Sequence, residues 1–167
     1  MLHTDQWLLG NQEEIVPLKK WQRTVNILAK VFSAPAGFIV QNTADGYQVV
    51  VASQQLENPY PADGSVVAPD TNIFCRKVVE SQQPLYVNDA SLEGGWEDNP
   101  EVTEDGFVSY LGLPISWPNG QPFGTFCVMD FERTEYQDNY IELMGELRDL
   151  IQADLALLDQ YQTICDL

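Results

Sequence analysis

The sequence is poor in basic residues and in the residue types that most metal motifs need. Its 167 residues include 8 Lys and Arg against 25 Asp and Glu, one His and three Cys, and the formal net charge is −17. Proteins bind nucleic acid or anionic lipid largely by neutralising phosphates with Lys and Arg, so this charge balance argues against both partners. No Cys/His set has the spacing of a zinc site.

Long hydrophobic runs are also missing. No segment approaches the ~18 consecutive apolar residues that a membrane span needs. Residues 1–14, MLHTDQWLLGNQEE, lack the basic region and the long apolar core of a signal peptide. Cys75, Cys127 and Cys165 have no short pair spacing, which argues against a disulfide framework and fits a reducing compartment. We therefore expect a cytoplasmic protein.

The sequence carries no motif of the common hydrolases. A GxxxxGK[ST] phosphate loop, a GxSxG nucleophile elbow and an HExxH zinc motif are all absent. The acidic residues from Glu97 to Glu104 could gather Ca²⁺, but they lack the alternate spacing and the turn glycine of a compact calcium loop. Solvated charge is the simpler interpretation. The sequence therefore predicts no catalysis by this domain and no metal site.

What the sequence does contain is enough apolar residues for one folded domain. Hydrophobic residues make up 44% and aromatic residues 11% of the chain, which excludes disorder. Val108–Ile115 and Phe123–Met129 are rich in β-branched and aromatic residues, and the turn residues Trp117–Gly120 (WPNG) join them. Because both segments are apolar along nearly their whole length, we expect two central antiparallel strands with both faces covered.

The other predicted elements complete an α+β pattern. The first half of the chain predicts an amphipathic helix that begins at Pro17 and ends at residues 33–37, a hairpin of strands Phe38–Gln41 and Tyr47–Ala52, and a loop over Asn58–Asp70. A short helix over Asn72–Gln82, capped by Asp70 or Thr71, and a strand Leu85–Val87 follow. The chain then continues with a long acidic crossing from Asp89 to Phe107 and a final helix over Gln137–Ile164. A crossing of this length inside one domain is typical of a lid or binding loop.

The final helix has more apolar residues than one contact with a sheet needs. One stripe holds Leu143, Leu147, Leu150, Leu157, Tyr161 and Ile164, interrupted by Asp154, and beside it lie Met144, Ile151, Leu155 and Leu158. Heptad-like spacing predicts either packing on the helix's own sheet or pairing with a second copy. We favour a homodimer through the terminal helices and keep the first interpretation as the alternative.

Four segments carry a family resemblance: Pro84–Ala90 (PLYVNDA), Ser109–Ile115 (SYLGLPI), Pro118–Gly120 (PNG) and Phe123–Asp130 (FGTFCVMD). Their order and spacing resemble those of the GAF domain family, which are small sensor and regulatory modules of bacterial signalling proteins and phytochromes. The resemblance implies an α+β, GAF-like and PAS-related fold. In that fold an antiparallel β-sheet has the N- and C-terminal helices on one face and a short helix plus long loops, forming a pocket, on the other.

The resemblance also implies a domain organisation and a function. Residues 1–16 would be an N-terminal arm, residues 17–158 the GAF domain, and residues 159–167 the end of a signalling helix that is cut before an output domain. The expected function is that of a sensor input domain, which binds a small molecule and passes the signal to an output module of the histidine kinase or diguanylate cyclase type. A structural dimerisation module without a ligand is the competing hypothesis.

The implied pocket lies between the short helix and the acidic crossing. Its candidate lining residues are Phe38, Phe74, Cys75, Val78, Asp89, Trp96, Ser109, Tyr110 and Cys127. Asp89, the Tyr110 hydroxyl and the Trp96 face could orient a small polar or cationic molecule, because an indole attracts cations where water is excluded. The alternative places Tyr110 and Phe126 in the core, Trp96 as a clip on the loop, and Asp89 as the cap of a turn.

Cys75 is the main candidate for thiol chemistry. It lies in the first turn or two of the predicted helix, whose dipole favours a thiolate, so it could be a redox sensor or an attachment point, with a buried inert thiol as the alternative. Bilin-binding relatives in the resembled family have a His shortly after their Cys, whereas Arg76 and Lys77 follow here, so we expect no bilin. Free methionine sulfoxide reductases of that fold use paired cysteines, and only Cys75 and Cys127 could approach each other. A cyclic-nucleotide signature is not found.

Overall fold

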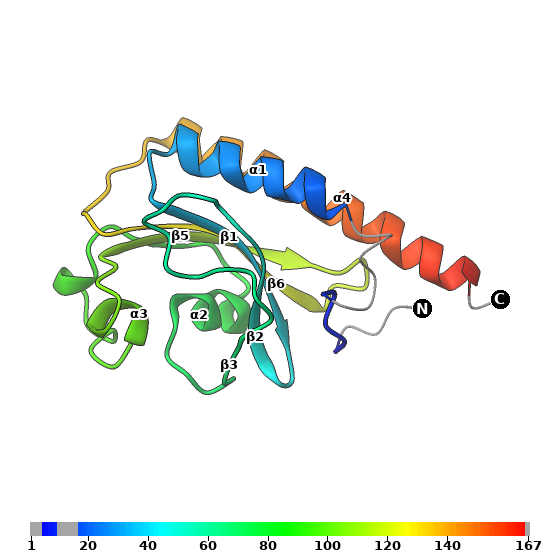
Figure 1. The fold of residues 1–167 in the computed structure, drawn as a ribbon, viewed down its shortest axis with the longest axis horizontal. Coiled ribbons are helices and arrows are strands. Elements are labelled where there is room, and N and C mark those ends of the chain that lie inside the picture. The colour runs from blue at the N-terminus through cyan, green and yellow to red at the C-terminus, as the bar shows by residue number, and fades with distance from the viewer. Residues whose placement is uncertain (1–4, 10–16, 166–167) are drawn as a thin grey trace.

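The computed structural model describes the backbone of residues 5–9 and 17–165, with side chains up to Tyr161. Six strands form one antiparallel sheet in the order β3-β2-β1-β6-β5-β4. The strands are β1 (Ala36–Thr43), β2 (Gly46–Ala52), β3 (Val66–Val67), β4 (Leu85–Val87), β5 (Ser109–Ser116) and β6 (Pro122–Asp130). The predicted α+β class is confirmed, with helices on both faces of this sheet (Figure 1).

The predicted central hairpin is confirmed. β5 and β6 pair from Ser109 opposite Asp130 to Ser116 opposite Pro122, and both strands are buried along nearly their whole length. The turn closes through the Gly120 amide, which donates to the Trp117 carbonyl at 2.9 Å. Gly120 has a φ of +84°, a conformation that an L side chain rarely adopts. The turn residues named from the sequence therefore fix the register of the sheet's centre.

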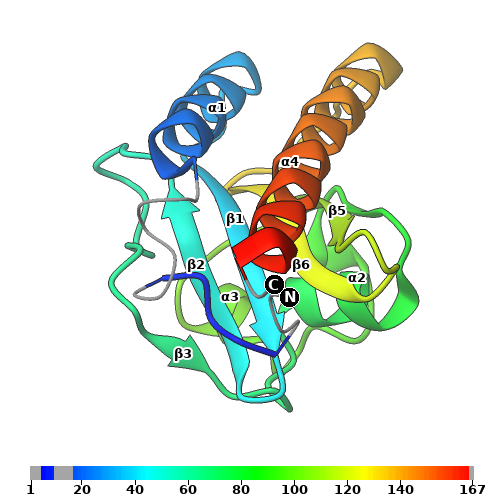
Figure 2. The same ribbon diagram turned by 90° about the vertical axis from the view of Figure 1, so that its right-hand side faces the viewer.

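Two long helices cover one face of the sheet. α1 (Leu18–Val31) and α4 (Asp138–Cys165) lie side by side and antiparallel over it (Figure 1 and Figure 2). The Trp21 indole N–H and the Lys20 ammonium both donate to the Asp154 carboxylate, at 2.9 and 3.0 Å. Asp154, which interrupts an apolar stripe in the sequence, therefore joins the two helices. The apolar residues beneath them form one buried cluster with the sheet.

The opposite face carries α2 (Phe74–Ser81), the short 3-10 helix η1 (Ala90–Leu92), α3 (Pro100–Thr103) and loops. The segments expected as plain loops therefore contain η1, α3 and the short edge strand β3. The predicted cap of α2 by Asp70 or Thr71 is wrong, because α2 begins at Phe74 and no side chain of its N-cap residue, Ile73, bonds to it. Its first amide instead donates to Glu101, a residue from α3.

A short N-terminal segment adds to the helix-covered face. Within the expected arm of residues 1–16, only residues 5–9 are described. Leu8 is buried in the cluster beneath the long helices. Its amide donates to the Gln41 side-chain oxygen at 2.9 Å, and the Gln41 amide group donates to the Gln6 carbonyl at 2.7 Å. This pair of bonds holds the segment on β1.

None of the described helices is both long and apolar enough to cross a bilayer.

Candidate functional site

A cavity of about 440 Å³ lies between the sheet and the layer that carries α2 and α3. Alternate residues of three neighbouring strands form its floor, because side chains two apart in a strand point to the same face. These floor residues are Phe38 and Val40 of β1, Tyr47 and Val49 of β2, and Cys127 and Met129 of β6. The floor is therefore largely apolar and is set by the pairing of β2, β1 and β6.

The walls of the cavity come from loops and short helices. They consist of Pro59, Tyr60, Pro61, Asp63, Ser65 and Val67 from the segment after β2, Ile73 and Cys75 from the start of α2, and Pro100, Glu101 and Asp105 from α3 and the turn after it. The end of the expected acidic crossing thus closes the cavity from one side. The segment after β2, which the sequence marks only as a Pro-rich loop, closes it from another.

Tyr60 joins these two walls. Its ring packs between Phe38 and Phe107, with ring centroids 5.9 and 5.7 Å away. Its hydroxyl donates a hydrogen bond to the Asp105 carboxylate. Burial, followed by this hydrogen bond, raises the pKa of Tyr60, so the hydroxyl stays protonated and remains a donor. The contact ties the Pro-rich segment to the end of α3 across the cavity.

Glu101 ties α3 to α2. The Asn99 side chain caps α3 by accepting the Glu101 amide at 2.9 Å, which orients the first turn. The Glu101 carboxylate in turn accepts the Phe74 amide at 2.9 Å. Only 8% of Glu101 is exposed, and this burial raises the pKa of its carboxyl to about 7, against the opposing effects of the Phe74 amide and the Asn99 side chain. A carboxyl that ionises near neutral pH therefore lines the cavity.

A thiol cluster lies at the bottom of the cavity. The Thr125 hydroxyl donates to the Cys75 sulfur at 3.1 Å, and the Tyr110 hydroxyl lies 3.5 Å from the same sulfur. Cys75 and Cys127 are both free and buried. Burial and the neighbouring Cys75 raise the pKa of the Cys127 thiol, which keeps it protonated. The Tyr110 ring lies directly over Gly112. A Cβ atom at position 112 would come within 2.1 Å of the Tyr110 hydroxyl oxygen, so this ring position requires a glycine there.

The structure divides the nine predicted lining residues into two groups. Phe38, Cys75 and Cys127 line the cavity. The other six do not line it: Phe74, Val78, Trp96 and Tyr110 belong to the buried cluster around it, Ser109 is a buried strand residue, and Asp89 caps η1. Phe74 stacks on Tyr110 and contacts Trp96, with centroids 4.9 and 4.6 Å away. The Asp89 carboxylate accepts the Ser91 amide, as in the turn-cap interpretation. A ligand-binding role for any of the nine stays a prediction.

Several lining residues were not predicted. Tyr47 and Val49 could have been found by continuing the two-residue alternation of the floor into the second strand. Tyr60, Glu101 and Asp105 have no comparable signal, since each reaches the cavity through a loop or a single helical turn whose direction depends on tertiary contacts. The acidic crossing was identified correctly as a wall, whereas its residues that face inward were not.

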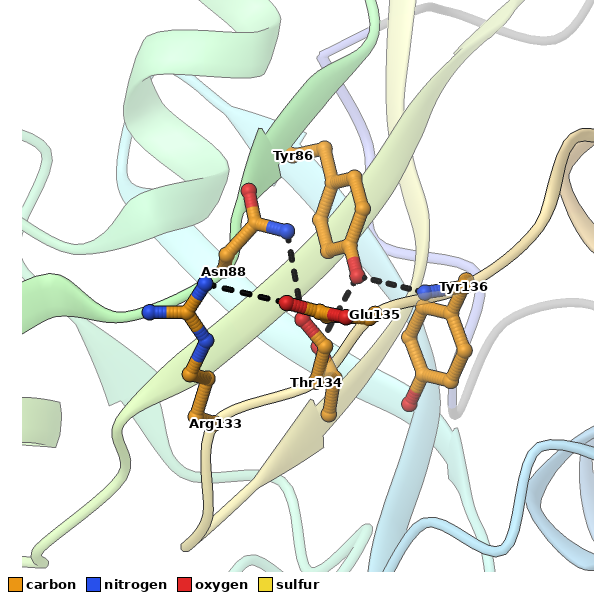
Figure 3. A network of polar contacts seen from close by, with 6 residues as sticks. All are labelled: Tyr86, Asn88, Arg133, Thr134, Glu135 and Tyr136. Carbon is orange, nitrogen blue, oxygen red and sulfur yellow. Dashed lines mark hydrogen bonds and ion pairs between the residues drawn. The ribbon is translucent and has the colours of Figure 1, made fainter.

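A polar network joins the edge strand β4 to the segment that leads into the long helix α4 (Figure 3). The Tyr86 hydroxyl, on β4, lies 3.1 Å from the Thr134 hydroxyl and accepts the Tyr136 amide at 2.9 Å. The Asn88 side chain donates to the Thr134 carbonyl at 3.1 Å. Tyr136 also packs edge-on against Phe32, which directly follows α1, with centroids 4.9 Å apart. β4 is therefore bonded to the segment that leads into α4.

Comparison with known proteins places these features in a family. The sequence model of the GAF domain matches residues 18–155, whereas no curated protein sequence matches the chain. The GAF domain of a phosphoenolpyruvate-protein phosphotransferase from Acinetobacter has a TM-score of 0.68 at 13% identity, covering 87% of this chain and 85% of its own. The phycoerythrobilin-bound GAF domain of a cyanobacterial phytochrome has a TM-score of 0.70 at 15% identity, with coverages of 86% and 88%.

An enzyme shares the same fold. The free methionine-R-sulfoxide reductase of Neisseria meningitidis, solved in complex with its substrate, has a TM-score of 0.66 at 13% identity, covering 86% of this chain and 80% of its own. At these identities the structural likeness concerns the fold alone. What this chain binds therefore has to be argued from its own cavity.

Proposed function

Because this chain belongs to the GAF domain family, we propose that it is a sensor and regulatory input domain that binds a small molecule and passes the bound state on through its terminal helices. The observation that carries the proposal is the cavity of about 440 Å³ between the sheet and the α2–α3 layer. Its volume lies within the usual range of small-molecule sites, and its apolar floor with a few polar wall groups is typical of them.

The contacts around the cavity supply a route for the signal. Glu101 lines the cavity and holds the first amide of α2. β4 follows α2 in the chain, and Tyr86 of β4 bonds to Thr134 and Tyr136 before α4 begins. A ligand that shifts α2 and α3 would therefore act on the start of α4 through this network. Such a switch requires that the ligand prefer one of two arrangements.

The outer face of α4 supports a homodimer. Leu143, Leu150 and Leu157 follow each other at seven-residue steps and are 41%, 56% and 66% exposed. In contrast, Met144, Ile151, Leu155 and Leu158 are buried against the helix's own sheet. The sheet contact is therefore complete without the exposed leucines, whose heptad spacing suits a second copy of α4. In this proposal the paired helices lead to an output module of the histidine kinase or diguanylate cyclase type.

A thiol reductase is the second candidate function. Cys75 and Cys127 both line the cavity, as a two-cysteine reduction of a sulfoxide would require. In that reaction the two thiols give a disulfide while the sulfoxide oxygen leaves as water and the thioether remains. The raised pKa of Cys127 opposes formation of a thiolate there. Turnover of free methionine-R-sulfoxide with a dithiol reductant, lost in Cys75→Ser, would establish the reductase instead of the sensor.

Native mass spectrometry of the purified protein, compared with the same sample denatured, tests the sensor proposal. A dimer that releases a small mass on unfolding supports a ligand-binding sensor and gives the ligand's approximate identity. An empty dimer, whose mass is that of two bare chains, favours the structural dimerisation module. A bare monomer contradicts the proposed dimer.

A further inference from the structure

The charged side chains that line the cavity all have one sign. Asp63, Glu101 and Asp105 line it, and its described lining includes no Lys, Arg or His. The whole chain has a net charge of −17, which adds to the negative potential at the cavity. An anionic ligand would have to enter against three carboxyl groups without a cationic partner. The charge of the lining therefore argues against carboxylate and phosphate ligands.

The three carboxyl groups are not arranged as a metal site. No group of three or more His, Cys, Asp or Glu side chains within the described part of the chain is placed to hold a metal ion. Each carboxylate also has its own protein contact: Asp63 accepts the Ser65 amide, Glu101 accepts the Phe74 amide, and Asp105 accepts the Tyr60 hydroxyl. These contacts hold the carboxylates at separate points around the cavity. They suit an organic cation better than a bare metal ion.

The rest of the lining is apolar and aromatic. The rings of Phe38, Tyr47 and Tyr60 contribute to it, together with aliphatic side chains, proline rings and thiols. An aromatic face attracts a cation, and the attraction strengthens where water is excluded. An apolar cavity also favours burial of a hydrocarbon body, at roughly 25 cal/mol per Å². The same walls thus offer a site for a positive charge and a site for an apolar group.

We propose that the ligand of this cavity is an organic cation, an amine or a quaternary ammonium on a compact apolar body, with Glu101 as its principal counter-ion. The proposal rests on the proposed sensor function and names its ligand class. Glu101 is the principal partner because it is the most deeply buried of the three carboxyl groups and is held at the α2–α3 seam. Asp105 is engaged by Tyr60, and Asp63 is exposed.

Glu101 also connects the cation to the signal. Its carboxylate accepts the first amide of α2, so a cation that draws this carboxylate toward the cavity changes the position of α2. The other titratable groups that act on Glu101 or respond to its charge are Asp105, Tyr60, Tyr110 and Cys127. All four are acids, so no protein cation competes with the ligand among them.

Three probes of one shape test the charge of the ligand: 3-phenylpropylamine, 3-phenylpropanol and 3-phenylpropionate, titrated by calorimetry at pH 8. At this pH the amine is cationic and Glu101 is mostly ionised. We expect the amine to bind about tenfold more tightly than the alcohol, because one charge-assisted hydrogen bond contributes that much. The propionate should bind most weakly. Equal or tighter binding of the alcohol or the propionate would overturn the cation class and leave the ligand-binding cavity standing.

Two variants test whether Glu101 is the counter-ion of the bound cation. Glu101→Gln should weaken amine binding about tenfold and leave alcohol binding unchanged, because only the charge is removed. Glu104→Gln is the matched control, since Glu104 follows α3, is exposed and does not line the cavity. If Glu101→Gln fails to fold, the amine is titrated into the wild-type protein at pH 5.5 and at pH 8 instead, and it should bind more weakly at pH 5.5, where Glu101 is protonated. If none of the three probes binds, native mass spectrometry of the purified protein decides the outcome. A neutral or anionic molecule released on unfolding contradicts the cation class alone. If no molecule is released, the sensor function is contradicted as well.

Discussion

The two faces of the sheet are built on different principles. The face under α1 and α4 is filled by apolar side chains from both helices and from the strands. The other face has a second buried cluster around α2, and loops and short helices that meet through polar contacts, such as Glu101 with the Phe74 amide and Tyr60 with Asp105, close it around a cavity. A packed face resists change, whereas a loop-closed face with few regular elements opens at lower cost. We therefore expect the helix-covered face to be the more rigid of the two.

The largest expected effect compares the same truncation on the two faces. Phe126→Ala removes a fully buried ring from the cluster beneath the helices and should cost about 3–5 kcal/mol of unfolding free energy. Phe38→Ala, on the neighbouring strand, removes a ring that is also buried but borders the cavity, so the cost should lie at the lower end of this range, about 3 kcal/mol. Urea unfolding of both variants measures the difference. Equal costs would mean that the cavity face is as tightly packed as the other.

Glu101 provides the next effect, through pH. Burial raises the pKa of its carboxyl from 4.5 to about 7, so between these values the folded protein holds a proton that the unfolded chain has lost. The contribution of Glu101 to the free energy of unfolding is therefore fully present below pH 4.5. It falls as the pH rises and is lost above pH 7, and the total loss is about 3 kcal/mol. Glu101→Gln should remove this loss. The reason is that a glutamine can still accept the Phe74 amide without becoming charged.

Urea unfolding at pH 5, 6, 7 and 8 measures the effect as the difference between wild type and Glu101→Gln. Other carboxyl groups titrate in both proteins and cancel in that difference. Glu104→Gln, which changes the same charge at an exposed position, is the control and should follow the wild-type curve. A difference that stays constant from pH 5 to pH 8 would show that Glu101 ionises at the same pH in the folded and unfolded chain.

The network of Figure 3, which ties the edge strand β4 to the segment before α4, should give a smaller effect. Tyr86→Phe removes a hydroxyl that contacts the Thr134 hydroxyl and accepts the Tyr136 amide, so about 1–2 kcal/mol of stability should be lost. A double-mutant cycle with Thr134→Val should give a coupling of about 0.5 kcal/mol or more. Purely additive effects would remove the network from the signal route proposed here.

The difference between the faces also explains what the sequence could predict. The helix-covered face follows from periodicity: the apolar spacing of α1 and α4, the unbroken apolar strands and the Pro-Asn-Gly turn each specify their own structure locally. These signals were sufficient for the fold class, and the structure has Leu85–Val87 as a strand with the predicted bounds. Both central strands end within one residue of the prediction.

The site was less predictable because its parts depend on tertiary contacts. The cap of α2 comes from Glu101, a residue 27 positions away, so no local rule for helix caps could identify it. Tyr60 enters the cavity because a Pro-rich segment folds over the sheet and is held by Asp105. Asp89, in contrast, has a local signal for a turn cap, and it adopts that role. Local sequence rules therefore favoured the capping interpretation over the cavity one.

The smallest effect on folding, with the largest effect on assembly, is expected on the outer face of α4. Leu150→Glu places a charge in the middle of the exposed stripe, so the free energy of unfolding of the subunit should change by less than about 0.5 kcal/mol. The proposed dimer should dissociate, because a buried unpaired carboxylate at the helix contact has no compensating partner. Leu92→Glu is the matched control: Leu92 is also an exposed leucine, 72% against 56%, but it lies on η1. Light scattering coupled to gel filtration measures the mass of each variant in solution. A dimer that persists in Leu150→Glu would mean that the exposed leucines have no part in pairing and that α4 only covers its own sheet.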